Sequence, residues 1–387
     1  MADLLVLKAL DPESAGAPEF RYLLSQVLLA ARRAFGSVRF LGDPAGLAEP
    51  PSLAGETAVL GLGPQNALLA EASLRAMRDA LAAGAMEARP TPLAEAGLAL
   101  EAPVYTLRGY ERAEATFLAQ IEHREPPPSH LPVALWSAER FAEIIRQVPI
   151  DRLLLDPAAL AGLPGSTVAA GLCHTFIDYY GEVREDVLPF VPADAREVLE
   201  IGCGRGLTGE FLQRTLGCRV TGVELNPEVA RDAARRLHAV HSGDVQTLEI
   251  LPPADGFDAV LALELFEHLT DSERFLARAR ELLRPGGRLV LSVPNVGHWA
   301  VVEDLLAGRW DYLPIGLLCY THYRFFTRRT LADWLARCGF ERAEIVAQTT
   351  ELPERFDRLD RLGASGETFG VDRESLATKG FYVVAFR

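Results

Sequence analysis

The amino-acid sequence predicts an α/β protein with two domains. Its 387 residues are more than one ordinary hydrophobic core accommodates. Short apolar runs alternate with amphipathic segments in both halves of the chain, and this alternation favours sheets that are covered by helices. In the second half, one apolar run leads directly into a glycine-rich loop, over Val198–Gly206. This loop is the strongest local signal in the chain.

The first predicted domain covers residues 1–125, and none of its motifs indicates a function. Strand-like and helix-like runs alternate in it, at Leu4–Ala9, Phe20–Ala34, Val38–Leu41, Thr57–Leu62 and Gln65–Ala83. The alternation resembles nucleotide-sugar-binding glycosyltransferase layers, but no D-x-D metal motif accompanies it. We therefore expect a parallel α/β layer with a scaffolding or substrate-presenting role.

A linker and helical connector is expected over residues 126–170. The run Glu125–Ser129 contains three consecutive prolines, which interrupt regular structure. Helical patterns follow at Ser137–Gln147 and Gly171–Val187. The second domain is accordingly expected over residues 171–387.

The second domain alternates strands and helices in a regular order. The predicted strands are Glu197–Ile201, Arg219–Val223, Phe257–Leu263, Arg288–Val293, Glu344–Ala347 and Phe381–Phe386. The predicted helices are Thr208–Thr215, Asn226–Leu237 and Asp271–Leu283. This pattern is typical of a Rossmann-like layer.

The glycine loop indicates a nucleotide-like ligand. Gly202, Gly204 and Gly206 stand at alternate positions, where they let the backbone turn sharply and approach a ligand closely. The helix that follows offers free backbone N–H groups at its N-terminus. Gly204, Gly206 and Gly209 also match G-x-G-x-x-G, so the glycines alone leave a dinucleotide open as the ligand.

Three acidic residues favour a different ligand. Glu200 lies two residues before the first glycine, where a carboxylate repels a pyrophosphate and suits an amino group. Glu224 ends the second strand, a position from which an acid accepts both ribose hydroxyls. Asp244 follows the third predicted strand and can accept from an adenine amino group. Together they provide one acid for each polar part of S-adenosylmethionine.

From about Tyr179 onward the chain resembles class I S-adenosylmethionine-dependent methyltransferases, in the branch with ubiquinone-type and glycan-type O-methyltransferases. The resemblance rests on VLEIGCGRG (198–206), VTGVELN (220–226), GDV (243–245), FDAVLALELFEHL (257–269), LLRPGGRLVLSVPN (282–295) and HYRFFTRRTL (322–331). It covers over half of the chain in the family's order. It implies a seven-stranded sheet of order 3-2-1-4-5-7-6 whose last strand is antiparallel.

The resemblance also implies which residues bind the cofactor. Tyr180 precedes the first strand, where relatives place a lid helix, and Cys203 packs beside the cofactor. The methionine end, the ribose and the adenine are assigned to Glu200, Gly202, Gly204, Gly206, Glu224, Leu225, Asp244 and Val245. Glu264 follows the fourth strand and is expected to face the cofactor from the other side.

Two histidines are candidate general bases, and four residues are candidate acceptor contacts. His268 and His322 could each take the proton of an attacking hydroxyl group. The candidate acceptor contacts follow the fifth strand or stand near His322, and they are Asn295, His298, Trp299 and Tyr320. Similar members of the family often have a charged pair before the residues that match Thr321-His322, where this chain has Cys319-Tyr320. The resemblance therefore does not identify the substrate.

The amino-acid composition limits the classes of partner and cofactor that we expect this protein to bind. The net charge of −14 disfavours nucleic acid and anionic membranes, and no apolar stretch is long enough for a membrane span. Lysine occurs only at positions 8 and 379, which excludes a Walker-A loop. The five cysteines form no C-x-x-C pair, as expected for reduced thiols in the cytoplasm. Sequence spacing indicates no metal site, and homo-oligomer formation stays open.

The sequence therefore predicts transfer of a methyl group from S-adenosylmethionine to an oxygen of a small molecule or sugar. The protein's main task would be to align the acceptor with the methyl group. One alternative is an NAD-type dinucleotide-dependent oxidoreductase, which Glu200 and the missing Tyr-x-x-x-Lys pair disfavour. Another is a protein that binds S-adenosylmethionine without turnover.

Overall fold

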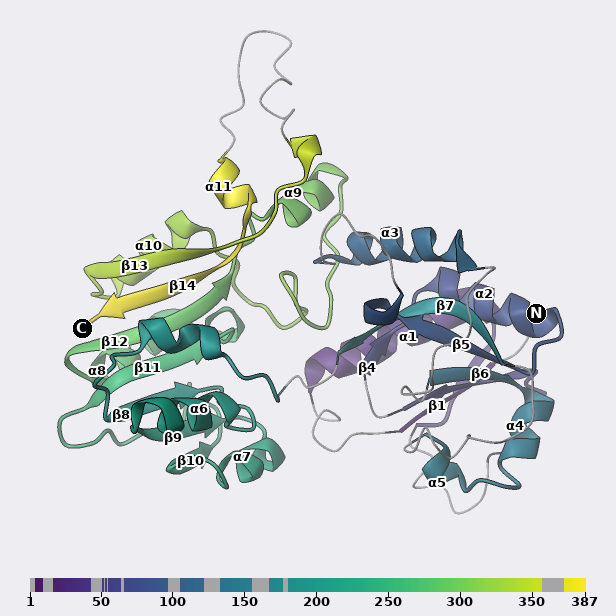
Figure 1. Cartoon of the computed structure of the whole chain (residues 1–387), viewed down its shortest axis with the longest axis horizontal. Helices are drawn as coiled ribbons and strands as arrows, with labels where there is room; N and C mark the ends of the chain where they lie inside the picture. The colour runs from purple at the N-terminus through teal and green to yellow at the C-terminus, as the bar shows by residue number, and fades with distance from the viewer. Residues whose placement is uncertain are drawn as a thin grey trace, which may run out of the picture. The chain divides into compact units, whose positions relative to one another are not determined.

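The structure is a computed structural model that describes residues 4–9, 17–42, 51, 53, 55–63, 66–96, 105–121, 133–154, 167–176, 180–356 and 372–387. Contacts divide the chain into two compact units, Met1–Ile177 and Asp178–Arg387 (Figure 1). The boundary therefore lies later than the expected start at residue 171. The reason is that β7 (Thr167–Phe176) pairs with strands of the first unit.

The first unit contains a seven-stranded sheet of order β2-β1-β3-β6-β5-β7-β4. Its other strands are β1 (Leu4–Lys8), β2 (Val38–Phe40), β3 (Ala58–Leu62), β4 (Asn66–Leu68), β5 (Glu87–Pro92) and β6 (Val133–Ser137). Strand β6 runs antiparallel to β3 and β5, and β4 runs antiparallel to β7. The sheet is thus mixed, and the expectation of a parallel layer was wrong.

The expected linker range contributes to the core of this sheet. Residues 133–136 of β6 are buried between β3 and β5, because their apolar run lacks a polar face for solvent. The Pro-rich run Glu125–Ser129 lies outside the described residues. The helices are α1 (Pro18–Phe35), α2 (Glu71–Ala82), η2 (Leu93–Glu95), α3 (Leu107–Leu118), α4 (Ala138–Ile144) and α5 (Ile150–Leu153).

The second unit contains a sheet of order β10-β9-β8-β11-β12-β14-β13. Its strands are β8 (Glu197–Ile201), β9 (Arg219–Glu224), β10 (Ala239–Ser242), β11 (Phe257–Leu263), β12 (Leu283–Pro294), β13 (Arg342–Thr349) and β14 (Thr378–Phe386). Counted from β8, the order reads 3-2-1-4-5-7-6. Strand β14 is antiparallel to both neighbours, and the expected topology is confirmed.

The helical elements of this unit differ from expectation mainly before the first strand. A helix was expected over Gly171–Val187, but β7 occupies the first part of that range and η5 (Glu185–Phe190) precedes β8. Pro189 within η5 limits it to a short 3₁₀ segment. The others are α6 (Leu207–Leu216), α7 (Pro227–Ala233), η6 (Phe266–His268), α8 (Ser272–Leu282), α9 (Trp299–Leu306), α10 (Arg328–Arg337) and α11 (Arg373–Leu376).

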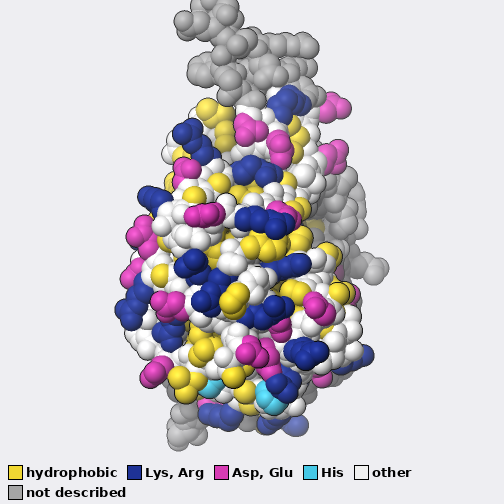
Figure 2. All heavy atoms as spheres, turned by 90° about the vertical axis from the view of Figure 1, so that its left-hand side faces the viewer, with side chains coloured by type: hydrophobic (Ala, Val, Ile, Leu, Met, Phe, Trp, Pro, Cys, Tyr) yellow, Lys and Arg dark blue, Asp and Glu magenta, His cyan; other side chains and the backbone are white. Residues whose placement is uncertain are grey.

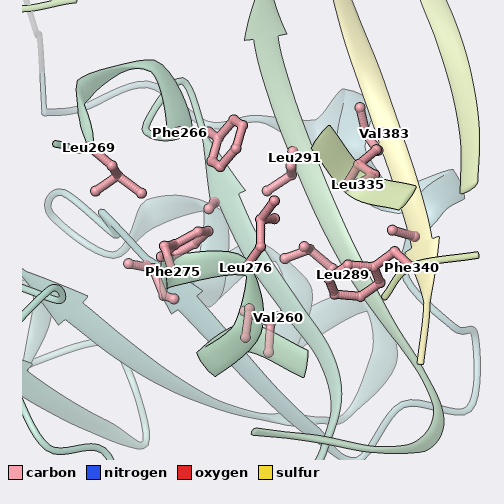
Figure 3. Packing of buried hydrophobic residues seen from close by; sticks show 14 of the residues in the cluster. Val260, Phe266, Leu269, Phe275, Leu276, Leu289, Leu291, Leu335, Phe340 and Val383 are labelled. Atoms are coloured by element: carbon pink, nitrogen blue, oxygen red, sulfur yellow. The ribbon is translucent and has the colours of Figure 1, made fainter. Parts of the chain in front are cut away.

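A large apolar core fixes the strand ends of the second unit. Side chains of β11 and β12 pack against α8 and α10, as Figure 3 shows for Val260, Leu276, Leu291 and Leu335. All four are at most 1% exposed. Phe266 of η6 belongs to the same cluster, so the segment after β11 is anchored by burial of an aromatic ring.

The surface of the second unit carries both signs of charge. On the face in Figure 2, arginine side chains lie among acidic and apolar ones. Arg342 and Glu344 on β13, for example, form an ion pair of 3.4 Å. In the part of the chain that the structure describes, no helix has the length and hydropathy that crossing a membrane requires.

We predict that Leu276→Ala lowers the free energy of unfolding by about 2–5 kcal/mol, because it leaves a cavity in this core. Leu276 is 0% exposed, whereas Leu251, the matched control, is 79% exposed. Leu251→Ala is expected to change the free energy by less than about 0.5 kcal/mol. Urea denaturation measures both, and equal effects would contradict the assigned core.

Candidate functional site

The loop after β8 requires glycine and lies against Tyr180. Gly202, Gly204 and Gly206 have φ values of 74°, 52° and 78°. A Cβ at Gly204 would lie 2.7 Å from the backbone oxygen of Tyr180, and Arg205 donates to that same oxygen at 3.0 Å. This contact holds the segment before β8 against the glycine loop. Tyr180, which the resemblance assigns to the cofactor site, therefore lies next to that loop.

Glu200 places a buried carboxylate beneath this loop. It is 4% exposed, and its Oε2 has no hydrogen-bond partner among the described residues. A Cβ at Gly209 of α6 would lie 2.7 Å from that oxygen, so the carboxylate abuts the helix start. Burial, and secondarily the charge of Glu224, raises its pKa to about 8. A cationic ligand group would satisfy this orphaned oxygen.

Glu224 is buried at the end of β9 and is held by backbone donors. Its Oε2 accepts from the Gly204 N–H at 3.0 Å, and its Oε1 accepts from the Asn226 N–H at 2.8 Å. Burial raises the pKa of this carboxyl group. The next residue, Leu225, is 68% exposed. An acid thus stands beside an open apolar side chain, a pairing that suits a ribose with its attached base.

Asp244 is exposed after β10, next to the buried Val245. Its Oδ1 accepts from the Gln246 N–H at 2.9 Å. Gln246 in turn accepts from the Thr270 and Asp271 N–H groups, each at 3.0 Å. The loop that carries Asp244 is therefore tied to the segment before α8, while the carboxylate itself stays accessible.

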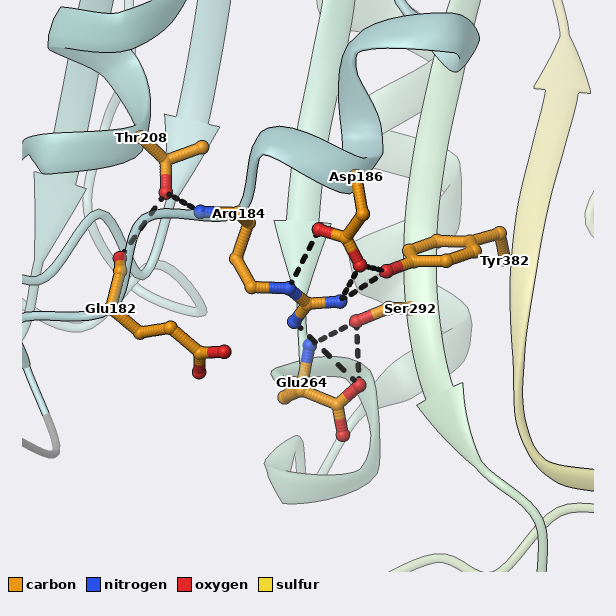
Figure 4. A network of polar contacts seen from close by, with 7 residues as sticks. All are labelled: Glu182, Arg184, Asp186, Thr208, Glu264, Ser292 and Tyr382. Carbon is orange, nitrogen blue, oxygen red and sulfur yellow. Dashed lines mark hydrogen bonds and ion pairs between the residues drawn. The ribbon is translucent and has the colours of Figure 1, made fainter. Parts of the chain in front are cut away.

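Glu264 follows β11 in a strained backbone conformation. Its φ of 49° is the one positive value of a non-glycine residue in the described segments. Its Oε1 accepts from the Ser292 hydroxyl at 2.7 Å, and its N–H donates to the Ser292 Oγ at 3.0 Å (Figure 4). Such strain persists where the surroundings over-determine the conformation, often at functional sites.

Arg184 brings a cation to the same edge. Its Nη1 lies 4.0 Å from Glu264 Oε1, and its backbone N–H donates to the Thr208 hydroxyl at 3.1 Å. Asp186 and Tyr382 hold the rest of the guanidinium (Figure 4). Arg184 precedes β8, and the sequence did not indicate these contacts, because Tyr382 and Glu264 lie far from Arg184 along the chain.

His268 of η6 and His322, which follows Thr321, lie next to each other. Their ring centroids are 4.7 Å apart in a T-shaped arrangement. His268 is half-buried, and its Nδ1 is 3.0 Å from the Thr321 hydroxyl. His322 is 8% exposed, and burial together with His268 lowers its pKa to about 3. His268 is thus the more accessible imidazole, and His322 is a buried neutral neighbour.

Glu267 completes a cluster that sequence spacing did not show. Its side chain is fully buried, and neither carboxylate oxygen has a hydrogen-bond partner in the described residues. Burial and the neighbouring Glu264 raise its pKa well above the ordinary value. Ligand atoms of Glu267, His268 and His322 all lie within 4.8 Å of one another. Folding thus gathers three groups that could hold a metal ion, which their spacing in the sequence did not indicate, and the expectation of no metal site stays a prediction.

Asn295 is buried, contrary to its expected role as an acceptor contact. Its Nδ2 donates to the backbone oxygens of Ser375 and Thr378 at 2.9 and 2.7 Å. Its Oδ1 accepts from the Gly297 N–H at 2.9 Å. Since the amide is occupied on both sides by backbone groups, Asn295 joins the end of β12 to the segment before β14.

His298 and Trp299 are also interior residues. His298 is 0% exposed, caps α9 by accepting from the Ala300 N–H, and lies 3.0 Å from the Thr350 hydroxyl. Burial, with the charge of Lys379, lowers its pKa to about 4. Trp299 is 6% exposed and packs near Phe356. Neither residue presents an open surface to an acceptor.

Tyr320 differs from these three residues, since its side chain is 47% exposed. Its ring meets that of Tyr312 at a right angle, with centroids 6.1 Å apart. It directly precedes Thr321, the hydroxyl partner of His268. Of the four expected acceptor contacts, Tyr320 therefore keeps an accessible position next to the histidine cluster.

The edge where β8, β9 and β11 end combines the acids Glu200, Glu224 and Glu264 with the Arg184 guanidinium and the accessible His268 imidazole. Cys203, the thiol of the glycine loop, is buried, and burial raises the pKa of this thiol far above its ordinary value. A protonated thiol is a poor nucleophile, so Cys203 acts as a packed small residue.

A family model described as a methyltransferase domain matches residues 175–345. A ubiquinone biosynthesis O-methyltransferase of Xanthomonas axonopodis pv. citri is 37% identical over 170 residues, which cover 41% of this chain and 68% of that protein. A protein of the same name from Xylella fastidiosa is 35% identical over 173 residues, which cover 42% of this chain and 67% of that protein.

Solved structures similar to the chain include a SAM-dependent methyltransferase from Archaeoglobus fulgidus. It shares 19% sequence identity, with a TM-score of 0.39. The similarity covers 52% of this chain and 90% of that one.

We predict that Glu200→Gln flattens the pH dependence of stability in the ligand-free protein. Because the folded pKa is raised to about 8 from 4.5, unfolding releases a proton between these values. The free energy of unfolding of the wild type therefore falls as pH rises through this window and then levels off. At pH 8.5 the variant should be more stable by about 1–3 kcal/mol.

Urea titrations from pH 5 to 9 measure this difference. Glu341→Gln is the matched control, since Glu341 is exposed. A wild-type stability that rises through the same pH window would contradict the buried, protonated carboxyl group.

Proposed function

The chain belongs to the class I S-adenosylmethionine-dependent methyltransferase family, and we propose that it methylates an oxygen of a small molecule or sugar. The observation that carries the proposal is the accessible His268 imidazole, fixed by Thr321 at the same strand edge as the orphaned Glu200 carboxylate. The bound cofactor supplies a methyl group that is already activated on a sulfonium.

The acids at this edge fit this cofactor. Glu200 and Glu264 would accept from the α-ammonium of its methionine part, and Glu224 from the ribose hydroxyls. The remaining contacts would come from the loop and the adenine side, through Tyr180, Gly202, Cys203, Gly204, Gly206, Leu225, Asp244 and Val245. A pyrophosphate offers no cationic group to the buried Glu200 carboxyl group, which disfavours the dinucleotide alternative.

The acceptor hydroxyl must lose its proton as its oxygen attacks the methyl carbon. A new O–C bond forms while the S–C bond breaks, and the proton passes to His268. In the tautomer whose Nδ1 donates to the Thr321 hydroxyl, 3.0 Å away, Nε2 is the nitrogen that would accept the proton. Alignment of the two reacting groups supplies most of the rate enhancement.

Aromatic side chains near this imidazole support a ring-shaped acceptor. Tyr320 and Tyr312 are both exposed, and Trp310 packs against Phe325 at 5.1 Å. Such surfaces stack on phenolic rings and on the apolar faces of sugars. The O-methyltransferase names of the relatives also support an oxygen acceptor.

Cysteine chemistry supports a reducing compartment, and we propose the cytoplasm. The five cysteines are free thiols, and all except Cys338 are buried. Proteins exported to oxidising compartments usually pair such residues.

We predict that His268→Gln lowers kcat by about 100-fold or more, because general-base catalysis contributes on the order of 10²–10⁴-fold. The cofactor Kd should change less than about twofold, since the variant keeps the cofactor contacts. His241→Ala is the control, because His241 is exposed on β10. Radiolabelled methyl transfer to 3,4-dihydroxybenzoate, a phenol, and to rhamnose, a sugar, measures the effect.

Unchanged kcat in His268→Gln would contradict the base assignment. The same assay with EDTA separates a base from a metal ligand. Retained activity supports the imidazole as base. Loss of activity that Mg²⁺ or Mn²⁺ restores would make His268 a ligand instead. Methylation of neither acceptor by a protein that binds the cofactor would favour the non-catalytic alternative.

A further inference from the structure

The Arg184 guanidinium is fixed on two of its three nitrogens. Its Nε and Nη2 donate to the two oxygens of Asp186, at 3.1 and 3.3 Å, and Nη2 also donates to the Tyr382 hydroxyl at 2.5 Å. Its Nη1 donates no hydrogen bond to any described residue and has Glu264 Oε1 at 4.0 Å. A largely buried arginine with 16% of its side chain exposed thus keeps two unused donors.

Tyr382, from a distant part of the chain, bonds to both Arg184 and Asp186. It lies on β14, and its hydroxyl donates to Asp186 while accepting from Arg184 (Figure 4). Its ring packs against Phe190 with centroids 4.8 Å apart. The phenol is therefore already placed by ring packing, and its hydroxyl orients the acid and the guanidinium together.

The unused donors of Arg184 face the candidate cofactor site. The Arg184 backbone is bonded to Thr208, at the start of the helix behind the glycine loop. Glu264, whose Oε1 lies 4.0 Å from Nη1, directly follows β11. Since β11 pairs with β8, Nη1 lies at the edge from which the glycine loop leaves.

We propose that Tyr382 is a positioning residue for the cofactor: with Asp186, it holds Arg184 so that Nη1 binds the α-carboxylate of the methionine part. This inference rests on the proposed cofactor site. An α-amino acid needs partners for both charges, and Glu200 and Glu264 serve only the ammonium. Arg184 brings a cation to this edge, and fixing its long side chain beforehand lowers the entropy lost on binding.

The hydroxyl of Tyr382 indicates that this residue positions Arg184 in addition to packing its ring against Phe190. Phenylalanine would keep the contact with Phe190 and would lose only the hydroxyl that joins Asp186 to Arg184. Asp186 has 53% of its side chain exposed, so on its own it is a weakly ordered partner. The hydroxyl thus determines where the guanidinium points.

The test is calorimetric titration of the full chain with two ligands that differ by one carboxylate. S-adenosylhomocysteine carries the α-carboxylate, and S-adenosyl-3-thiopropylamine keeps the amine without it. We expect Tyr382→Phe to weaken binding of the first about 5–20-fold, as expected for a poorly aligned charge-assisted hydrogen bond. Binding of the second ligand should change less than about twofold.

Two further variants complete the design. Tyr323→Phe removes the same hydroxyl from a tyrosine that is 58% exposed, and it should leave both affinities unchanged. Arg184→Gln should weaken S-adenosylhomocysteine binding at least as much as Tyr382→Phe. Adding Tyr382→Phe to Arg184→Gln should then have no further effect, because the two residues act through one contact.

Outcomes of three kinds would overturn the inference. Unchanged S-adenosylhomocysteine affinity in Tyr382→Phe, or an additive double variant, shows that the hydroxyl does not position Arg184. Equal weakening of both ligands shows a general distortion of the site. Wild-type protein that binds neither ligand overturns the proposed function together with this inference, which distinguishes that failure from the other two.

Discussion

Buried carboxyl groups at the ends of neighbouring parallel strands are the constraint on which the functional unit depends. Glu200 near the end of β8 and Glu224 at the end of β9 are both nearly inaccessible, and each has a raised pKa because burial disfavours its charge. Burying such groups costs free energy unless partners satisfy them. The Gly204 N–H of the glycine loop and the Asn226 N–H after β9 each donate to Glu224, while Glu200 keeps an orphaned oxygen. A ligand with a cationic group would relieve that cost.

The sheet order brings the far end of the chain to this edge. Because β14 inserts between β12 and β13, Tyr382 reaches Asp186 and Arg184 from almost two hundred residues away along the chain. Ser292 on β12 holds the strained Glu264 in the same network. The C-terminal strand is thus a structural element of the sheet and also supplies Tyr382 to the Arg184–Asp186 network, which we propose to position the cofactor.

The sequence allowed prediction of features that local patterns encode. The glycine loop, the acids after the strands and the order of the second sheet follow from short motifs and from the family resemblance. Features that depend on long-range packing could not be predicted in this way. Asn295 and His298 have the polarity of ligand contacts, yet packing buries them as joints between segments. Residues 133–136 appeared to belong to a connector, because no local signal shows that β3 and β5 leave a place for β6.

The most direct test of the account is calorimetric titration of the wild type and Glu224→Ala with S-adenosylmethionine, S-adenosylhomocysteine and NADH. The account predicts micromolar binding of both sulfur cofactors by the wild type, loss of this binding in the variant, and no binding of NADH. Binding of NADH without binding of the sulfur cofactors would contradict it, and the glycine loop would then serve a dinucleotide.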